Sequence, residues 1–171
     1  MNSKMNGKMI SKMITHGSKV QLATAHLKNM RHCPIIYLGE IGSFKDYQPH
    51  IITLHKSQID VIQEFPNLEM YKFGQSTNIY RRLVLEHRQK FKYFDIKLLR
   101  ESYRHQEVER IIQRELFARN LLLRLKWDNR IQREIMFFRE EKDKLWYKNM
   151  VDDLVHQRLQ QTKFVDIDLF H

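Results

Sequence analysis

The chain has 171 residues, of which 42% are hydrophobic and 29% are charged. This length excludes a second full domain beside one globular unit, and this composition excludes a chain that is disordered throughout. Lysine and arginine outnumber aspartate and glutamate by 30 to 20, which gives a net charge of +10 and makes polyanions the natural partners.

No apolar stretch approaches the roughly 20 residues that cross a bilayer, and the longest are Ile35–Leu38 and Leu121–Leu123. Lysines interrupt the methionine-rich start, so it lacks the apolar segment of a secretory signal. Cys33 is the only cysteine, which excludes an intrachain disulfide and fits a reducing compartment. We therefore expect an intracellular protein that has no membrane partner.

Residues 1–33 are expected to form a basic, flexible leader in front of one domain at 34–171. The leader holds six lysines and arginines and no acidic residue, and a Lys-Met dipeptide recurs in it every four residues from Lys4 to Met13. A helix there would carry lysines and methionines on adjacent stripes, but so short a helix is marginal without a partner. A disordered tail and a helix that forms on contact with phosphate, lipid headgroups or another protein both stay open.

Three strands are predicted after the leader. Ile35–Leu38 is a short apolar run before a glycine, which indicates a buried strand. Residues 43–69 follow as a long irregular connection, with one short helix that begins near Ser57. Met70–Phe73 is the second predicted strand, and the alternating segment Tyr93–Arg100 is the third.

Three helices are predicted around these strands. Asn78 is a suitable N-cap for a helix from Ile79 to about Lys90, and His105–Ala118 carries an apolar stripe at helical spacing. The last helix is expected over about Glu140–Gln160. Three shorter apolar segments complete the domain: the run Leu121–Leu125, an edge strand at Ile135–Phe138, and a docking strand at Val165–Leu169.

Gly74 stands between the second strand and the first helix, and no glycine follows it. A glycine is favoured where φ is positive or where a group approaches the main chain closely. Ser76 and Asn78 expose a hydroxyl and an amide at the helix start, and Arg81 and Arg82 follow in its first turn. Helix N-termini attract anions and guanidinium groups bind phosphate, so this segment is a candidate phosphate site. A surface ion pair of Arg82 with the acidic residue four positions later is the alternative.

Five features follow one another in a fixed order along residues 34–155. They are Ile36-Tyr37, Tyr71-Lys72-Phe73-Gly74, Gln75-Ser76-Thr77-Asn78, Arg82 eight residues after that glycine, and a helix with Glu109. Together with Arg133–Phe138, this order resembles the GIY-YIG nuclease superfamily. The resemblance is to a viral and phage branch whose second motif reads Tyr-Lys-Ile-Gly or Tyr-Lys-Phe-Gly, which would place the protein in the host cytoplasm or nucleus.

The resemblance implies a mixed α/β fold in which a small three-stranded antiparallel sheet, flanked by helices, carries one active site. Tyr37 would match the tyrosine of the first motif, Arg82 the helix arginine, and Glu109 the metal-binding glutamate. Lys72 stands where the family has its second tyrosine and is the fourth catalytic candidate. The implied activity is endonucleolytic hydrolysis of DNA phosphodiester bonds with Mg²⁺ or another divalent metal, which needs a metal ligand, a cation and a group that positions water.

Six further residues are candidate nucleic-acid contacts: Tyr71, Gly74, Ser76, Asn78, Arg81 and His87. The histidine that the family commonly has one helical turn after the arginine is Glu86 in this chain. His87 comes one residue later, which would turn it about 100° around an α-helix.

Two other functions stay open beside the nuclease. A catalytically inactive domain would bind DNA through Lys72, Arg81, Arg82 and the leader lysines, and RNA is a further possible partner. A viral protein-interaction module would instead use the leader to dock on another protein. Added salt should weaken phosphate binding steeply but not an apolar contact. The nine histidines lack paired cysteines, which argues against structural zinc, and the sequence does not indicate an oligomeric state.

Overall fold

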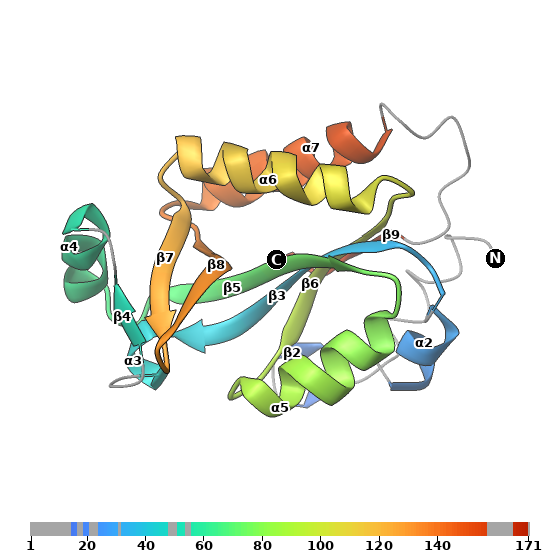
Figure 1. The fold of residues 1–171 in the computed structure, drawn as a ribbon, viewed down its shortest axis with the longest axis horizontal. Coiled ribbons are helices and arrows are strands. Elements are labelled where there is room, and N and C mark those ends of the chain that lie inside the picture. The colour runs from blue at the N-terminus through green and yellow to red at the C-terminus, as the bar shows by residue number, and fades with distance from the viewer. Residues whose placement is uncertain are drawn as a thin grey trace.

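The computed structural model of the protein describes residues 15–16, 19–20, 24–30, 32–47, 51–53, 56–156 and 166–170. These residues form a mixed α/β fold, in which helices cover both faces of one antiparallel sheet (Figure 1). In Figure 1, α6 (His105–Ala118) and α7 (Glu141–His156) lie above the sheet. Below it lie α2 (Thr24–Asn29), the π-helix η1 (Arg81–His87) and α5 (Arg88–Lys90).

The sheet has seven strands in the order β4-β7-β8-β5-β3-β6-β9. Their bounds are β3 (Ile35–Ser43), β4 (Ile51–Thr53), β5 (Glu69–Ser76), β6 (Asp95–Glu101), β7 (Leu122–Trp127), β8 (Arg130–Phe137) and β9 (Asp166–Asp168). The expectation of a three-stranded sheet is therefore wrong. The three predicted strands correspond to β5-β3-β6 within this sheet. Three strands, β8, β7 and β4, extend it beyond β5, and one strand, β9, extends it beyond β6. Two short strands, β1 (Thr15–His16) and β2 (Lys19–Val20), pair with each other.

The β7–β8 hairpin accounts for much of this extension. β8 pairs with β7 on one side and with β5 on the other, so the prediction of an edge strand at Ile135–Phe138 is wrong. Asp128 and Asn129 form the connecting turn with positive φ angles of 45° and 66°, which suits the twist of a two-residue hairpin. Because the turn lacks the glycine that commonly marks such hairpins, the sequence gives only a weak signal for it.

The long connection predicted as irregular contains three elements: α3 (Phe44–Tyr47), β4 and α4 (Lys56–Glu64). The short helix expected near Ser57 is confirmed by α4. The helix expected over His105–Ala118 is confirmed with the same bounds by α6. β9 pairs with β6, which confirms the docking strand predicted near the end of the chain. Within the described ranges, no helix is both long and apolar enough to span a membrane.

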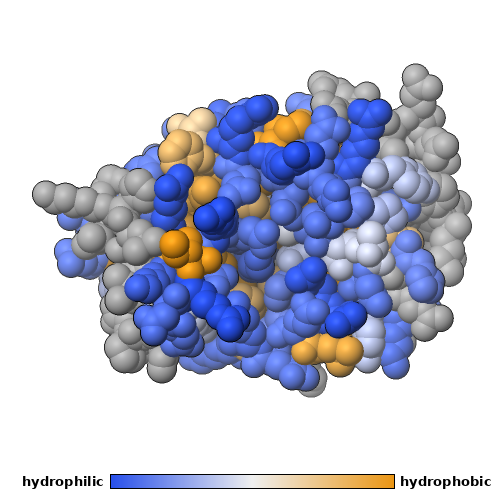
Figure 2. Space-filling model, in the orientation of Figure 1, coloured by the Kyte–Doolittle hydropathy of each residue, from blue (hydrophilic) through white to orange (hydrophobic). Residues whose placement is uncertain are grey.

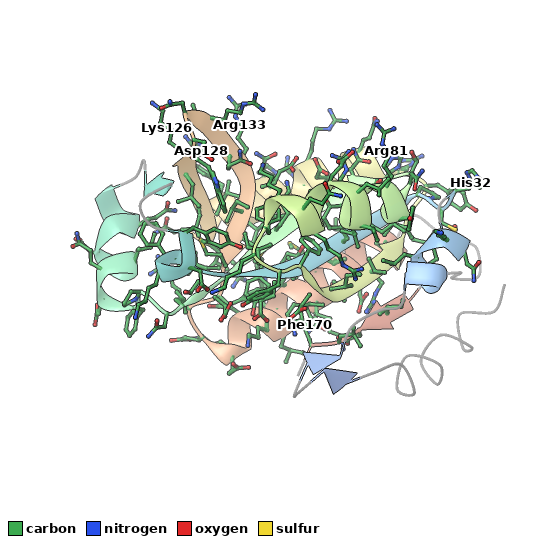
Figure 3. The ribbon with its side chains drawn as sticks, turned by 90° about the horizontal axis from the view of Figure 1, so that it is seen from below. His32, Arg81, Lys126, Asp128, Arg133 and Phe170 are labelled. Atoms are coloured by element: carbon green, nitrogen blue, oxygen red, sulfur yellow. The ribbon has the colours of Figure 1, made fainter. Side chains whose placement is uncertain are left out.

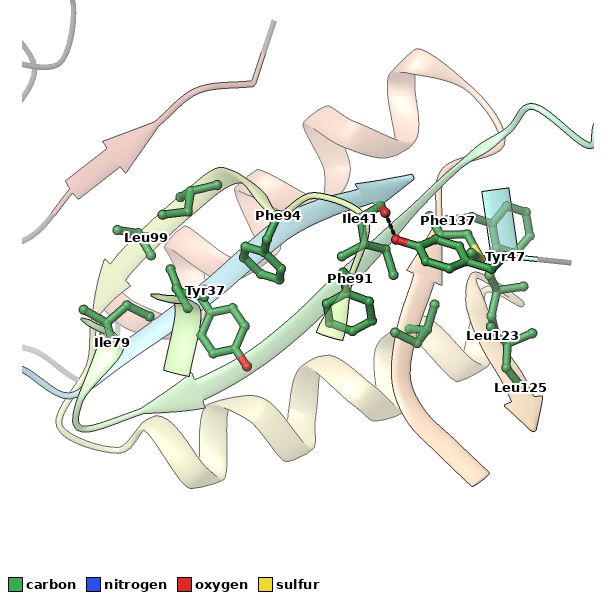
Figure 4. Close-up of a cluster of buried hydrophobic side chains, with 14 of the residues drawn as sticks. Tyr37, Ile41, Tyr47, Ile79, Phe91, Phe94, Leu99, Leu123, Leu125 and Phe137 are labelled. Atoms are coloured by element: carbon green, nitrogen blue, oxygen red, sulfur yellow. Dashed lines mark hydrogen bonds between the residues drawn. The ribbon is translucent and has the colours of Figure 1, made fainter. Parts of the chain in front are cut away.

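The core has one half on each face of the sheet, because alternate residues of β3 point to opposite faces. The lower half holds Tyr37 and the aromatic side chains around it (Figure 4). The upper half is closed by the apolar stripe of α6 and by Tyr147 and Val151 of α7. Helices thus seal both faces, and polar groups can gather only where the layers open.

Part of the stretch expected to be a flexible leader packs on the domain. Leu27 in α2 is fully buried and Met30 is 4% exposed, and both belong to the lower half of the core. The Lys-Met repeat from Lys4 to Met13 lies outside the described residues. The described fold therefore begins before residue 34.

Gly39 in β3 leaves no room for a side chain, because a Cβ atom there would overlap the ring of Phe94. We expect Gly39→Ala to lower the free energy of unfolding in urea by about 2 kcal/mol through overpacking. The double variant Gly39→Ala/Phe94→Leu should lose less stability than the two single losses added together, since the smaller side chain vacates the overlapping space. An unfolding free energy that Gly39→Ala leaves unchanged would contradict this packing.

Candidate active site

The strand β5 extends beyond its pairing with β8. The two strands pair only over Met70–Lys72 and Ile135–Phe137, so β5 continues to Ser76 without β8 beside it. α6 covers one face of the sheet here and η1 covers the other (Figure 1). Side chains from both faces can therefore meet beside the exposed edge of β5.

Tyr37 and His87 form a buried pair at this edge. The Tyr37 hydroxyl and Nε2 of His87 lie 2.7 Å apart in a hydrogen bond. Tyr37 on β3 stands opposite Gly74 on β5, and a Cβ atom at Gly74 would lie 2.5 Å from the Tyr37 hydroxyl oxygen. Gly74 is thus required because a tyrosine crosses it closely, and among the described glycines only Gly42 has a positive φ.

The π-helical form of η1 brings His87 to Tyr37. Between Arg81 and His87 the helix follows a π pattern, in which backbone hydrogen bonds span five residues rather than four. Arg82 and His87 are five positions apart, so the wider turn places them on one face. The rotation of about 100° expected for an α-helix therefore does not apply. The side chain of His87 is only 6% exposed. Single π-helical turns are frequent at functional sites.

Both members of the Tyr37–His87 pair are held in their neutral forms. Burial, together with charge repulsion from Lys72 and Arg82, lowers the pKa of His87 to about 3. Burial also raises the pKa of Tyr37, although the charge of Arg82 opposes this rise. The Phe94 ring stacks on His87 with 5.0 Å between the ring centroids and 21° between the planes. The site therefore contains an uncharged phenol and imidazole against an aromatic wall.

Lys72 lies on the same face and forms an ion pair with Glu134 of β8. Lys72 is 7% exposed, and burial lowers its pKa while the charge of Glu134 opposes that effect. The carboxylate of Glu134 thus compensates a buried cation at the position of the family's second tyrosine.

Sequence reasoning did not select Glu134 as a site residue. Between the pairs Leu123–Ile135 and Leu125–Gln132, one β7 residue faces two β8 residues, Arg133 and Glu134. This β-bulge changes the direction of the side chains that it contains. Only the position of Glu134 inside the segment Arg133–Phe138 of the family resemblance could have drawn attention to it.

Glu109, on α6, interacts with the Lys72–Glu134 pair. Together with Tyr37 and His87, these residues form the buried cluster of the candidate site. Burial, together with repulsion from Glu134 and a hydrogen bond with it, raises the pKa of Glu109 to about 7. Lys72 and Arg82 oppose this rise through their positive charges. Two carboxyl groups that share a hydrogen bond hold a proton between them when no cation neutralises both. Glu109 therefore lies within electrostatic reach of both candidate cations.

Arg82 lies at the mouth of the cluster. Its guanidinium is 3.2 Å from Glu86, and Arg81 is 3.7 Å from the same carboxylate. The expected surface ion pair of Arg82 is therefore present. The charge of Arg82 nevertheless acts on Tyr37 and Glu109 as well, so one guanidinium faces both the surface partner and the buried cluster.

A polar hollow of about 440 Å³ opens beside Arg82. Its walls include Ser76, Asn78, Arg81 and Arg82 from the β5–η1 junction and His105 and Gln106 from α6. Asn78 caps the helix as predicted, because its Oδ1 accepts the backbone N–H of Arg81 at 3.1 Å. Three candidate nucleic-acid contacts, Ser76, Asn78 and Arg81, thus line one cavity next to the catalytic candidates.

Tyr71 does not join this group. As the neighbour of Lys72 in a strand, it points to the opposite face of the sheet. Its ring centroid lies 4.9 Å from that of Phe138 and 6.5 Å from that of Phe170. The structure therefore separates Tyr71 from the candidate site.

Glu109 and Glu134 are the residues that could hold a divalent cation. Mg²⁺ prefers oxygen ligands and is commonly bound by one or two carboxylates, with water and substrate phosphates completing its shell. A group of three or more metal-ligating side chains does not occur among the residues that the structure describes. Both side chains supply carboxylate oxygens of the kind that Mg²⁺ prefers, so this pair fits Mg²⁺ with water and phosphate as further ligands.

The raised pKa of Glu109 predicts how stability depends on pH without metal. The pKa is 4.5 in an unfolded chain and about 7 in the fold, so folding favours the protonated carboxyl. The stabilisation that comes from keeping Glu109 protonated is fully present below pH 4.5. It is lost as the pH rises through about 7. In EDTA, the melting temperature of wild type should therefore fall relative to that of Glu109→Gln between pH 4.5 and 7. A constant difference over this interval would contradict the raised pKa.

Comparisons of the chain with family models, with curated proteins and with solved structures find no match. The likeness to the GIY-YIG superfamily thus remains a resemblance of motifs. Tyr37, Arg82 and Glu109, which come from β3, η1 and α6, influence one another electrostatically.

Proposed function

We propose that the protein hydrolyses phosphodiester bonds of DNA with the assistance of a divalent metal, as an endonuclease of GIY-YIG type. One observation carries this proposal. Tyr37, Arg82 and Glu109 are distant in sequence, yet they gather with His87 and Lys72 at the exposed edge of β5. This set contains a group that can position water, a cation for phosphoryl oxygens and a metal ligand, which are the groups that hydrolysis requires.

The hollow beside Arg82 is the proposed place of the scissile phosphate. The guanidinium of Arg82 would donate hydrogen bonds to the non-bridging oxygens and stabilise their charge as it grows in the transition state. Glu86 holds this guanidinium at the mouth of the cluster, 3.2 Å away, and thereby limits its freedom before the substrate arrives.

Tyr37 and His87 would position the attacking water. The phenol O–H of Tyr37 donates to Nε2 of His87, 2.7 Å away, which would leave the phenol oxygen free to accept a hydrogen bond from the attacking water and orient it. The water would lose its proton to solvent, since His87 is held neutral. The resulting hydroxide forms a bond to phosphorus, the bond to the leaving oxygen breaks, and that oxygen takes a proton from solvent. A cation bound by Glu109 and Glu134 would supply Lewis-acid polarisation of a phosphoryl oxygen.

Supercoiled plasmid tests this function directly. The full chain is incubated with plasmid in MgCl₂ or in EDTA, and nicked and linear products are measured over time. We expect cleavage with MgCl₂ only, and we expect Arg82→Ala to slow it by about a hundredfold or more, the typical cost of losing one charge-stabilising donor. Lys142→Ala serves as the control, because Lys142 lies exposed on α7 beside Glu140. Cleavage that Arg82→Ala leaves unchanged would overturn the proposed site.

A second candidate function is binding of nucleic acid without cleavage. The ion pair between Lys72 and Glu134 favours it, because the ammonium already neutralises one of the two carboxylates that would hold a metal. In this case wild type would not cut plasmid, yet Arg82→Ala would still weaken DNA binding, and added salt would weaken it steeply.

A further inference from the structure

The β7–β8 hairpin carries a concentration of positive charge outside the candidate site. Its four cationic residues are Arg124, Lys126, Arg130 and Arg133. Within the described ranges, none of them forms an ion pair with an acidic side chain. Arg124 instead lies over the ring of Phe117, 4.9 Å from its centroid. These charges are thus available to an external polyanion.

The hairpin and the start of η1 lie on either side of the candidate site. Figure 3 shows Lys126 and Arg133 on the projecting hairpin and Arg81 on η1, all at the same side of the molecule. Glu134, which pairs with Lys72, follows Arg133 in the chain, and Arg82 follows Arg81, so each cationic group adjoins a residue of the candidate site. Figure 2 shows the face of the molecule that is turned toward the viewer in Figure 1. This face is largely hydrophilic, with a few separate apolar side chains.

The outer part of β8 is free to meet a partner along its edge. Its pairing with β5 begins at Ile135, so Arg130–Gln132 have β7 on one side and no described strand on the other. Because β4 pairs with the far side of β7 over Leu125–Trp127, the β8 edge is the open edge at this end of the hairpin. Ile131 is 58% exposed in this segment, although it belongs to a strand. A sheet with its side chains is about 10 Å thick, which fits the major groove of B-form DNA at about 12 Å but not the minor groove at about 6 Å.

We propose that the β7–β8 hairpin enters the major groove of duplex DNA beside the phosphodiester bond at the candidate site. The four cationic residues contact phosphates on the two sides of the groove, and Ile131 makes an apolar contact with base edges such as a thymine methyl group. The placement beside a scissile bond rests on the proposed function. The docking of the duplex itself does not require cleavage.

The shape of the ligand distinguishes duplex DNA from other nucleic acids. The major groove of A-form RNA is deep and narrow and would exclude the hairpin, and a single strand has no groove. We therefore expect the hairpin to contribute to binding of duplex DNA, and to contribute much less to binding of duplex RNA or of single strands.

Fluorescence anisotropy with labelled 20-base-pair DNA in EDTA tests this proposal. The full chain is compared with Lys126→Glu/Arg130→Glu and with the control Lys142→Glu/Lys144→Glu, which makes the same charge change on α7. At about 0.1 M NaCl the hairpin variant should bind duplex DNA at least tenfold more weakly, and the slope of log affinity against log salt should fall by about two. The control should bind within about twofold of wild type. Melting temperatures establish that each variant folds.

The outcomes separate this proposal from the proposed function. Equal duplex affinity and equal salt slope for wild type and the hairpin variant would overturn it, whether or not plasmid is cut. An equal loss of affinity for duplex DNA and for single strands would also overturn it, because simple charge attraction would then suffice. If wild type never cuts plasmid but the duplex-specific loss is observed, the nuclease proposal fails and the groove contact stands. If Ile131→Ala also weakens duplex binding, the apolar contact is supported.

Discussion

Glu109→Gln is expected to reduce Mg²⁺-dependent plasmid cleavage by about a thousandfold or more. Glutamine keeps the size of the side chain but removes the charge that would hold the cation, and a metal typically supplies several kcal/mol of transition-state stabilisation. The burial of Glu109 and its hydrogen bond with Glu134 make the loss difficult to compensate from solvent. The measurement is the single-turnover rate of nicking with enzyme in excess over plasmid.

Glu107→Gln is the matched control for this variant. Glu107 lies two residues before Glu109 on α6, and its carboxylate is 3.8 Å from the guanidinium of Arg104. It should retain cleavage within about twofold, since exposed ion pairs contribute little. Glu109→Gln should also be at least as stable as wild type in EDTA at pH 7, because it removes a carboxyl whose ionisation the fold disfavours. Loss of cleavage together with loss of folding would contradict the role assigned to Glu109.

Gly74→Ala has the second largest expected effect. The added Cβ atom would lie 2.5 Å from the Tyr37 hydroxyl oxygen and 2.8 Å from the ring carbon that bears it. The ring must therefore move, and its hydrogen bond with His87 is lost. We expect cleavage to fall by at least about a hundredfold, which is the typical cost of displacing a group that positions a reactant. The rate of plasmid nicking below the melting temperature measures this effect.

Gly39→Ala provides the comparison for Gly74→Ala. Both glycines lie in central strands and face an aromatic side chain, but a Cβ atom at Gly39 meets Phe94 rather than Tyr37. Gly39→Ala should therefore lose stability, and its cleavage rate at low temperature should fall less than that of Gly74→Ala, because Phe94 contacts the Tyr37–His87 pair only through its ring. Gly74→Ala should lose cleavage even where it is fully folded. Equal activity of the two variants would refute a specific need for the Tyr37–His87 geometry.

Local patterns predicted the elements that depend on neighbours in the sequence. α6 occupies His105–Ala118 because its apolar residues recur at helical spacing and its buried side chains form one stripe. The three central strands follow from short apolar or alternating runs next to glycines and polar residues. Asn78 could be recognised as a cap because capping uses contacts within one turn.

The remaining features depend on pairing between distant segments. The bulge at Arg133–Glu134 exists only relative to β7, so no periodicity within β8 reveals that Glu134 points toward Lys72. The π-helical turn that brings His87 to Tyr37 likewise differs from an α-helix in hydrogen bonding and not in composition. Tyr71 was selected with the motif that contains it, but strand alternation places it on the other face of the sheet.

Anomalous diffraction from crystals of the full chain soaked in MnCl₂ above pH 7 tests the central claim most directly. Mn²⁺ accepts the same oxygen ligands as Mg²⁺ and can be located by its own scattering. The account predicts a peak between the carboxylates of Glu109 and Glu134, next to Lys72 and the Tyr37–His87 pair, and its loss in Glu109→Gln crystals. No peak at this place, or a peak that Glu109→Gln leaves unchanged, would contradict a metal-assisted hydrolytic site.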